Sequence, residues 1–404
     1  MHIILVCREY VGSARSGGIG SYMHEIAKAY VAGGHTVTVV TASDDTECES
    51  ESVDSYGIHV ISLSGGDFFV PSAENGTALK KLRCIYRFYS YRKKLARIVS
   101  GITDADIVEV ADFGAEGLYL SKLHIPVVIR LHTPQSLSIA DFSVVRPKWW
   151  RLHRSLPIFA EKIIFERARY ITGCSQAILD WVGNNYNIKN AMTAVVKNPI
   201  EISADIRDTP HTNDNSVKTI FFAGTISDTK GVGDLVEACD ILRHEGFEIR
   251  LKLAGKGGSF QTMLRQKIIE NGWDWIEFLG KLPRERVYDN YTTADVCCFP
   301  SWWENMPMVV IESMALGAVV VSTDAGGIGE IITNGHDGFL CERRKPATLA
   351  STLRNVLSLD DDQRLYIKHN AQATVRENFT VGRISEEMLA FFDKVIKNFN
   401  GLRK

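Results

Sequence analysis

The chain has 404 residues, which exceeds what one ordinary hydrophobic core supports, so its length predicts two domains of roughly 200 residues each. Apolar residues make up 45% of the chain and charged residues 23%, a composition typical of soluble globular proteins. The net charge of -2 excludes a whole-chain attraction to nucleic acid, and no uninterrupted run reaches the roughly 18 apolar residues of a membrane-spanning helix.

The cysteines and the first residues of the chain bear on the cellular compartment. The 8 cysteines are scattered without a CxxC pair or a zinc-ligand spacing, so we expect reduced thiols. The opening MHIILVCREY carries an apolar stretch that is too short and too soon charged for a signal peptide. The sequence therefore predicts a cytoplasmic protein.

Short apolar runs recur along the chain, and each is followed by a helical pattern. In the first half they read HIILVC, TVTVVTA, DIVEVA, VVIRLH and YITGCS, and in the second half TIFFAG, RLKLAG, IEFLG, VCCFP, AVVVST and GFLCE. Runs that are apolar on both faces suit parallel strands covered by helices, and their alternation with helices predicts βαβ units. The sequence thus predicts an α/β protein with two Rossmann-like, parallel-sheet domains.

The domain boundaries are predicted from ISADIRDTPHTNDNSVK, residues 202 to 218, a polar segment without periodicity that is typical of a linker. We expect an N-terminal domain over residues 1–201 and a second domain over residues 202–383, facing each other across a deep cleft. Ligands of open parallel sheets bind outside the carboxyl ends of the strands, so this cleft is the expected site. The amphipathic residues 384–404 predict a helix that packs back on the first domain.

A glycine-rich turn follows the first predicted strand. Gly17, Gly18 and Gly20 stand where the strand gives way to a helix, and there backbone N–H groups can approach an anion. The dinucleotide-binding pattern is incomplete, because Met23 stands where its third glycine belongs, and Asp44 is only a weak candidate for a ribose ligand. A turn without any ligand is the alternative.

Three strand-to-helix turns of the second half carry further candidates. The first contains Lys230 just before a helix, a position for a phosphate ligand or simply for a solvated lysine. In the second, Pro307 suits the first turn of a helix, which places Glu304 in the loop ahead of it and Glu312 inside it. The third, STDAGGIGEII, exposes backbone amides at its paired glycines. We expect these turns to lie at one edge of the second domain.

Glu304 and Glu312 form an E-x(7)-E pair, preceded by Pro300-Ser301 and followed by Ser313-Met314-Ala315. With GGIG early in the chain, TISDTKG midway and DAGGIGEII after the pair, the chain resembles a retaining glycosyltransferase of family 4, group 1 type, over nearly its whole length. The resemblance implies the two-domain GT-B fold. It also implies that Glu312 holds the ribose hydroxyls of a sugar nucleotide, that Glu304 contacts the donor sugar, and that Lys230 neutralises the diphosphate.

The resemblance implies a full set of site residues. A lone histidine at a strand end is more often structural, but His132 matches a family histidine that reaches the donor sugar or the reaction centre. The catalytic set is then His132, Lys230 and Glu304, and the donor-binding set comprises Gly17, Gly18, Thr225, Lys230, Glu304, Asn305, Met308, Glu312 and Gly327.

Thr225 departs from the family pattern, which has an arginine at that position. Lys230 with backbone amides, or another base such as Lys256 or Arg130, is expected to compensate for the missing charge, unless activity is reduced. Asn198, in the turn toward the linker, is interpreted as structural.

The implied activity is that of a hexosyltransferase that moves a hexose from a UDP- or GDP-linked sugar to a glycan or lipid-linked acceptor. It would serve cell-surface polysaccharide or glycoconjugate biosynthesis, without a metal or another cofactor, and with the acceptor bound to the N-terminal domain. Two alternatives stay open: a sugar-nucleotide epimerase of the same fold, and a sugar-nucleotide-binding subunit without turnover.

Two basic, aromatic stretches concern the acceptor side. Residues 79–98 and 146–154 combine many cations with tyrosines, phenylalanines and tryptophans, which suits an anionic membrane surface or a phosphorylated acceptor. A solvated helix with a partly buried aromatic loop is the alternative. Nucleic acid is not expected as a partner, because no known nucleic-acid-binding motif accompanies the patch.

Overall fold

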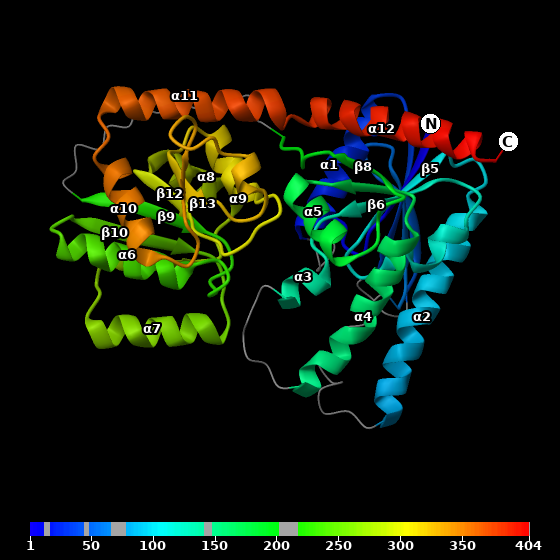
Figure 1. Ribbon diagram of the computed structural model, residues 1–404, viewed down its shortest axis with the longest axis horizontal. Coiled ribbons are helices and arrows are strands. Elements are labelled where there is room, and N and C mark those ends of the chain that lie inside the picture. Colours follow the sequence, from blue (N-terminus) through cyan, green and yellow to red (C-terminus); the bar gives the residue numbers. More distant parts are fainter. Residues whose placement is uncertain (12–16, 44–47, 66–77, 141–147, 202–216, 404) are drawn as a thin grey trace. The chain divides into compact units, whose positions relative to one another are not determined.

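The computed structural model describes residues 1–11, 17–43, 48–65, 78–140, 148–201 and 217–403 (Figure 1). Asp44 and most of the predicted linker, residues 202–216, lie outside the described residues. The chain divides into two compact units, which are described separately. Unit 1 comprises Met1–Pro199 together with Val381–Lys404, and unit 2 comprises Ile200–Thr380.

In the described part of unit 1, eight strands form one sheet in the order β3-β4-β2-β1-β5-β6-β7-β8. Every neighbouring pair is parallel except β3 with β4. The strands are β1 (His2–Val6), β2 (Thr36–Ala42), β3 (Ser50–Val53), β4 (His59–Leu63), β5 (Ile107–Ala111), β6 (Val127–Leu131), β7 (Tyr170–Gly173) and β8 (Met192–Val195).

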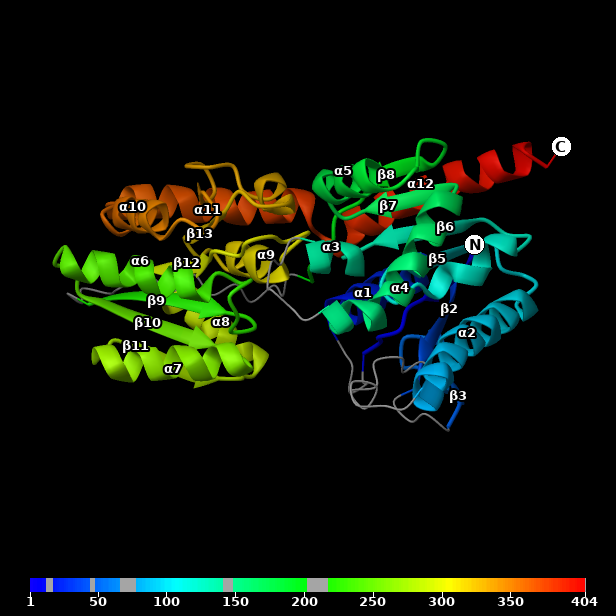
Figure 2. The same ribbon diagram turned by 60° about the horizontal axis from the view of Figure 1, so that its bottom comes forward.

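Helices cover this sheet, and one of them comes from the end of the chain. They are α1 (Gly18–Ala32), α2 (Ala78–Gly101), the 3-10 helix η2 (Glu116–Lys122), α3 (Gln135–Ala140), α4 (Lys148–Arg167), α5 (Gln176–Asn185) and α12 (Val381–Gly401). η2 packs against both α2 and α4 (Figure 2). α12 contacts α1 and buries Ile384, Met388 and Phe392 fully in the core of unit 1.

The sheet of unit 2 is parallel between all neighbours, in the order β11-β10-β9-β12-β13-β14. Its strands are β9 (Lys218–Ala223), β10 (Ile249–Ala254), β11 (Ile276–Gly280), β12 (Val296–Phe299), β13 (Val320–Thr323) and β14 (Phe339–Cys341). Its helices are α6 (Val232–His244), α7 (Ser259–Asn271), α8 (Arg284–Thr293), α9 (Met308–Ala315), the 3-10 helix η3 (Gly327–Glu330), α10 (Pro346–Leu357) and α11 (Asp361–Asn378).

The predicted fold class is confirmed, since each unit carries a mainly parallel sheet with helices between its strands. All the apolar runs quoted above form strands that pair in parallel. The strands that the sequence did not predict, β3, β4 and β8, lie at or next to the two edges of the sheet of unit 1 and are mostly exposed or half-buried.

Candidate active site

The sheet order of unit 2 brings the three predicted turns together. β9, β12 and β13 are neighbours and parallel, so the loops that follow them leave the sheet at the same edge. The backbone N–H of Trp302 donates to the carbonyl oxygen of Thr229 at 3.0 Å, and the indole of Trp302 donates to the Asp234 carboxylate at 2.7 Å. The first two turns are thus hydrogen-bonded to each other.

Glu304 links all three turns. The Lys230 ammonium donates to its carboxylate as an ion pair, and the Ser301 hydroxyl donates to the same oxygen at 3.1 Å. The carbonyl oxygen of Glu304 accepts the backbone N–H of Gly327 at 2.9 Å. The side chains of Lys230 and Glu304 are 36% and 19% exposed, so a ligand at this edge can reach both charges.

Two glycines allow these turns to pack backbone against backbone. Gly231 has a φ of +68°, and a Cβ there would lie 1.9 Å from the carbonyl oxygen of Pro300. Gly326 has a φ of +66°, and a Cβ there would lie 2.1 Å from the carbonyl oxygen of Glu304. Both a left-handed backbone and a missing side chain are required at these two positions.

Glu312, on α9, faces an arginine that the sequence did not single out. Its carboxylate lies 3.6 Å from the Arg284 guanidinium at the start of α8. Burial raises the pKa of Glu312, and the positive charge of Arg284 opposes that rise. In the sequence, Arg284 is marked only by its place after Pro283 at the start of a helix, which does not indicate a partner. Its proximity to Glu312 results from the packing of α8 against α9.

The remaining candidates of unit 2 surround the same turns. Thr225 is exposed two residues after the end of β9, Asn305 is buried, and Met308 is the first residue of α9. Pro307 is the N-cap of α9 and not a residue of its first turn, so the predicted helix start was one position too early. Lys256 is exposed in the loop after β10, whose backbone pairs with the loop after β9.

The candidate glycines of unit 1 differ in their surroundings. Gly17 is the N-cap of α1 and Gly18 is its first residue. A Cβ at Gly18 would meet no described atom within 4 Å, whereas one at Gly20 would lie 3.0 Å from the carbonyl oxygen of Glu9. A side chain at Gly20 would therefore press on the backbone of Glu9, whereas Gly18 borders open space within the described part of unit 1.

His132 follows the last residue of β6 and is 7% exposed. Its ring makes an edge contact with Tyr22, with ring centroids 5.1 Å apart. Burial, and then the charge of Arg130, lower the pKa of His132 well below its ordinary value, so the imidazole is neutral near pH 7.

Two buried carboxylates that the sequence analysis missed hold the loop of His132. The backbone N–H of His132 donates to Asp112 at 3.0 Å, and those of Gln135 and Ser136 donate to Glu161 at 3.0 and 3.4 Å. Burial raises the pKa of Asp112 to about 7 and that of Glu161 to about 8. Glu161 could have been predicted as a buried acid, because it stands within the mainly apolar run FAEKII.

Arg130 does not fit the role of the cation that compensates for the charge missing at Thr225, so that prediction was wrong. It is fully buried, its guanidinium lies 4.6 Å from the centre of the Tyr22 ring, and it donates to the Asn198 side chain at 3.0 Å and the Lys197 carbonyl at 3.2 Å. Asn198 accordingly has a structural contact, as interpreted from the sequence.

The basic stretch 79–98 lies on α2, and part of it faces the interior. Phe88, Tyr91 and Arg92 are buried, and the Arg92 guanidinium donates to the carbonyl oxygens of Phe88 at 2.7 Å and Ala115 at 3.0 Å. Tyr86 by contrast is 73% exposed. For the stretch 146–154, residues 146 and 147 and the side chains of 148–154 lie outside what the structure describes.

No described helix combines the length and apolarity needed to cross a bilayer. No group of three or more potential ligands among the histidines, cysteines, aspartates and glutamates that the structure describes could hold a metal ion.

Comparison with known families assigns both halves of the chain. Residues 16–204 match the model of glycosyltransferase family 4, and residues 205–374 match that of glycosyl transferases group 1. A glycogen synthase from Mycobacterium tuberculosis is 24% identical over 378 residues, which cover 88% of this chain and 86% of the relative. A D-inositol 3-phosphate glycosyltransferase from Corynebacterium urealyticum is 28% identical over 252 residues, 58% of this chain and 59% of the relative.

Solved structures resemble the whole chain. Sucrose-phosphate synthase from Thermosynechococcus elongatus superposes with a TM-score of 0.77 at 19% identity, covering 98% of this chain and 99% of that one. HepE from Anabaena, solved with UDP and glucose, superposes with a TM-score of 0.70 at 18% identity, covering 97% and 99%. Since the two family models together span residues 16–374 and the fold matches throughout, the chain belongs to the group 1, family 4-type glycosyltransferases and has the GT-B fold.

Proposed function

We propose that the protein is a retaining hexosyltransferase that uses a UDP- or GDP-linked sugar as donor and a glycan or lipid-linked molecule as acceptor. Its role would be cell-surface polysaccharide or glycoconjugate biosynthesis. The observation that carries the proposal is the position of Glu304, which pairs with Lys230 and joins three turns at one sheet edge, with Glu312 on the adjoining helix.

Related proteins support the donor and acceptor classes. HepE from Anabaena was solved with UDP-glucose, and a trehalose-6-phosphate synthase with UDP-2-fluoro glucose. A putative colanic acid biosynthesis glycosyltransferase from Salmonella typhimurium is 27% identical over 179 residues, 42% of this chain and 43% of the relative. These names make a UDP-sugar the first donor to test, and a polysaccharide precursor the first acceptor.

Each residue of the unit 2 site has a task in the proposed reaction. Glu312, an acceptor for two hydroxyl hydrogen bonds when ionised, would hold the ribose, and Glu304 would hold hydroxyls of the hexose. Lys230 would stabilise the charge that grows on the leaving diphosphate. The backbone N–H groups at Met308 and directly after Gly327 would face the phosphates, where helix N-termini favour negative charge.

The proposed step transfers one glycosyl group and needs no further reactant. The bond between the anomeric carbon and the donor phosphate oxygen breaks, and a bond from that carbon to the acceptor oxygen forms on the same face. The acceptor hydroxyl proton passes to an oxygen of the leaving diphosphate. The neutral imidazole of His132 is proposed to contact the donor sugar, and Gly17 and Gly18 to offer backbone N–H groups. No metal or cofactor is part of the proposal.

Transfer assays with single variants test this assignment. In Lys230→Ala, we expect turnover to fall by at least about 100-fold and donor affinity to change less, because the diphosphate gains charge in the transition state. In Glu312→Ala, we expect donor binding to weaken by on the order of 1–3 kcal/mol in calorimetric titration. Lys267→Ala, an exposed lysine on α7, is the matched control.

The outcomes separate the proposal from its alternatives. Unchanged donor affinity in Glu312→Ala would remove the ribose assignment. An epimerase would convert the donor without an acceptor, and a binding subunit, which Thr225 keeps under consideration, would bind the donor without consuming it. A panel of sugar nucleotides in a thermal-shift screen should precede these assays, because a ligand of the folded state raises the melting temperature.

We also propose that the protein works in the cytoplasm and contacts the inner face of the membrane through α2. The exposed cations of α2, Arg83, Arg87, Lys93 and Arg97, support this. Each contributes about 1 kcal/mol near an anionic surface. Co-sedimentation with vesicles should then require anionic lipid, and binding that is independent of lipid charge would contradict the proposal.

A further inference from the structure

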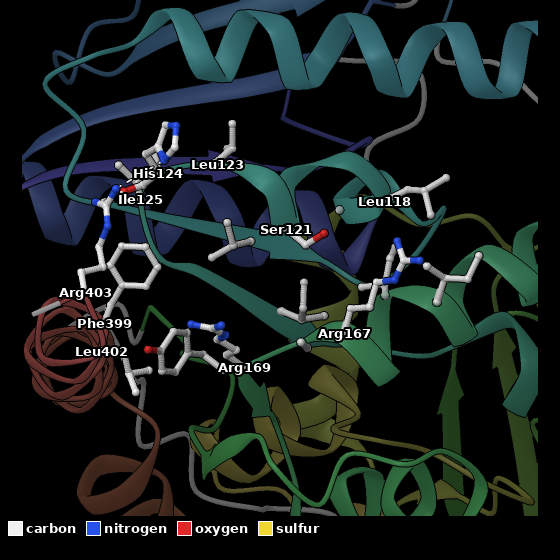
Figure 3. Close-up of a pocket in the computed structure, with 17 residues that line it drawn as sticks. Leu118, Ser121, Leu123, His124, Ile125, Arg167, Arg169, Phe399, Leu402 and Arg403 are labelled. Atoms are coloured by element: carbon white, nitrogen blue, oxygen red, sulfur yellow. Dashed lines mark hydrogen bonds between the residues drawn. The ribbon is translucent and has the colours of Figure 1, made fainter.

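Unit 1 holds a pocket of about 360 Å³, a volume within the range of small-molecule sites (Figure 3). It lies among η2, the last turn of α4, the first residues of β6 and β7, and the end of α12. β6 runs from Val127, which lines the pocket, to Leu131, which precedes His132. The pocket therefore opens at the amino ends of the strands, about 15 Å of strand away from the loop of His132.

Three guanidinium groups line this pocket without a matching acid. Arg403 lies at one end in Figure 3, Arg167 at the other and Arg169 between them. Of the residues that line it, none is aspartate or glutamate. No carboxylate of the described chain forms an ion pair with Arg167, Arg169 or Arg403. The pocket thus carries uncompensated positive charge, and arginine binds phosphate groups with two parallel hydrogen bonds.

Arg403 is held in position by neighbouring groups. Its Nη1 donates to the carbonyl oxygen of His124 at 2.9 Å, and its guanidinium lies 5.4 Å from the centre of the Phe399 ring. The Tyr170 hydroxyl donates to the Asn398 side chain at 2.8 Å, which fixes this end of α12 to the first residue of β7. The end of α12 is therefore a fixed part of the pocket lining.

Apart from the arginines, Ser121 and His124 are the polar residues of the lining, and most of the others are apolar. The apolar part consists largely of leucine, isoleucine and aromatic side chains, among them Leu118, Ile125, Ile129, Ile163, Phe399 and Leu402. Leu402 is 62% exposed, although it is a large hydrophobic residue. A polar anion such as a free sugar phosphate would leave this surface without a partner, whereas a hydrocarbon chain would remove it from water.

We infer that this pocket binds an amphiphilic phosphate, with the phosphate on Arg167, Arg169 and Arg403 and the hydrocarbon against the apolar lining. Such a ligand could be a lipid with a phosphate headgroup or a soluble alkyl or acyl phosphate, since both present the same chemistry. Because the pocket lies at the sheet edge opposite to His132 and belongs to unit 1 alone, the inference does not depend on the proposed transfer reaction.

A chain-length series tests the inference on the full-length protein. Calorimetric titration with inorganic phosphate, butyl phosphate and octyl phosphate should show affinity rising with chain length, because each buried methylene contributes about a four-fold gain. We expect octyl phosphate to bind at least 10-fold more tightly than inorganic phosphate, which is about 1.4 kcal/mol. Equal affinity for the two would overturn the inference, as would the absence of saturable binding.

The variants separate a built site from general attraction to positive charge. Arg167→Gln combined with Arg169→Gln removes two exposed cations of the pocket, and we expect at least a 10-fold loss of octyl phosphate affinity. Arg87→Gln combined with Arg97→Gln removes two exposed cations of α2 that do not line the pocket, and should leave the affinity unchanged. Equal losses in both double variants would overturn the inference. Melting temperatures without ligand check that each variant is folded.

Vesicles distinguish the two sources of the ligand. To remove the contribution of α2, both proteins in this comparison carry Arg83→Gln, Arg87→Gln, Lys93→Gln and Arg97→Gln. If the source is a lipid, vesicles that contain phosphatidic acid should retain the protein with the intact pocket and lose the one that also carries Arg167→Gln and Arg169→Gln. If it is a soluble amphiphile, octyl phosphate should bind while the two proteins co-sediment equally. Both results support the site, and failure of both octyl phosphate and vesicles to distinguish the variant from the wild type overturns it.

Discussion

Glu304 and Glu312 are residues of the same type, eight positions apart, but their electrostatic surroundings differ. Glu304 pairs with the Lys230 ammonium and accepts a hydrogen bond from the Ser301 hydroxyl. The Glu312 side chain is exposed to the same degree, and burial raises its pKa while the positive charge of Arg284 opposes the rise. The ionisation of Glu312, and with it the proposed ribose contact, is therefore sensitive to one arginine.

Replacement of Arg284 should make donor binding depend more strongly on pH. In the wild type we expect affinity to rise with pH above the ordinary glutamate pKa of 4.5, as Glu312 ionises. In Arg284→Gln the opposing charge is lost, the pKa rises further, and the increase in affinity should move to higher pH. Calorimetric titration across this range measures the shift. Arg286→Gln, on the same helix, is the control, and an equal shift there would contradict the assignment.

Gly231 positions Lys230 at the start of α6 and should not tolerate a side chain. In Gly231→Ala the new Cβ would meet the Pro300 carbonyl oxygen in a left-handed backbone, so we expect the free energy of unfolding to fall by on the order of 2 kcal/mol or more. Gly246→Ala, beyond the other end of α6, has a φ of +94° and no atom within 4 Å among the described residues. Its loss should be about 1 kcal/mol, from backbone strain alone. Urea denaturation compares the two, and equal losses would exclude the clash.

The loop between β6 and α3 shows how an element is held by charges outside it. Asp112 comes from the end of β5 and Glu161 from α4, and both accept backbone N–H groups of the loop. Burial raises the pKa of Asp112 to about 7, and burial together with repulsion by Asp112 raises the pKa of Glu161 to about 8. The loop that presents His132 is therefore fixed by two acids whose ionisation is unfavourable in the folded state.

This arrangement predicts that stability falls as pH rises. A carboxyl group with a raised folded pKa binds a proton more tightly when folded, so its stabilisation is complete below the unfolded pKa near 4 and is lost up to the folded pKa. The free energy of unfolding should decrease between about pH 4 and pH 8, by on the order of 1.4 kcal/mol per pH unit for Glu161. Glu161→Gln should flatten this decrease. Glu166→Gln, exposed on the same helix, should not, and urea denaturation at several pH values measures both.

At the scale of the whole molecule, the chain crosses twice between the units. Ile200 and Thr380 form a β-bridge within unit 2, and Ile200 N–H donates to the Phe379 carbonyl oxygen at 2.8 Å. The chain therefore enters and leaves unit 2 at one place. It returns to unit 1 as α12, whose apolar face completes a core begun by the first residues of the sequence.

Removal of α12 should unfold unit 1 and spare unit 2. A chain that ends at Thr380 lacks several fully buried side chains of the unit 1 core, each contributing about 1.5–3 kcal/mol. We expect loss of the unit 1 unfolding transition in calorimetry, with the unit 2 transition retained. A chain that ends at Gly401 is the control and should keep both. Two transitions in the shorter chain would show that α12 is dispensable.

The sequence alone determined the fold class and the main candidates of unit 2. Apolar runs that alternate with helices are a local pattern. Strands that are buried on both faces must be apolar, so strands such as β1 and β9 could be predicted directly from the sequence. Strands β3 and β8 were missed because edge strands bury too little surface to show this pattern. The E-x(7)-E pair could be recognised in the sequence because both glutamates lie in one turn and the helix that directly follows it, so their spacing is a local property.

Only the tertiary structure decided which charges face one another. Three observations each depend on residues from different elements: the Arg284–Glu312 contact, the burial of Arg130, and the hydrogen bonds from the loop of His132 to Glu161. The same is true of the arginine-lined pocket, which brings residues of η2, α4 and β7 beside the last residues of the chain. Sheet order and helix packing set these distances, and neither can be predicted from the spacing of residues along one segment.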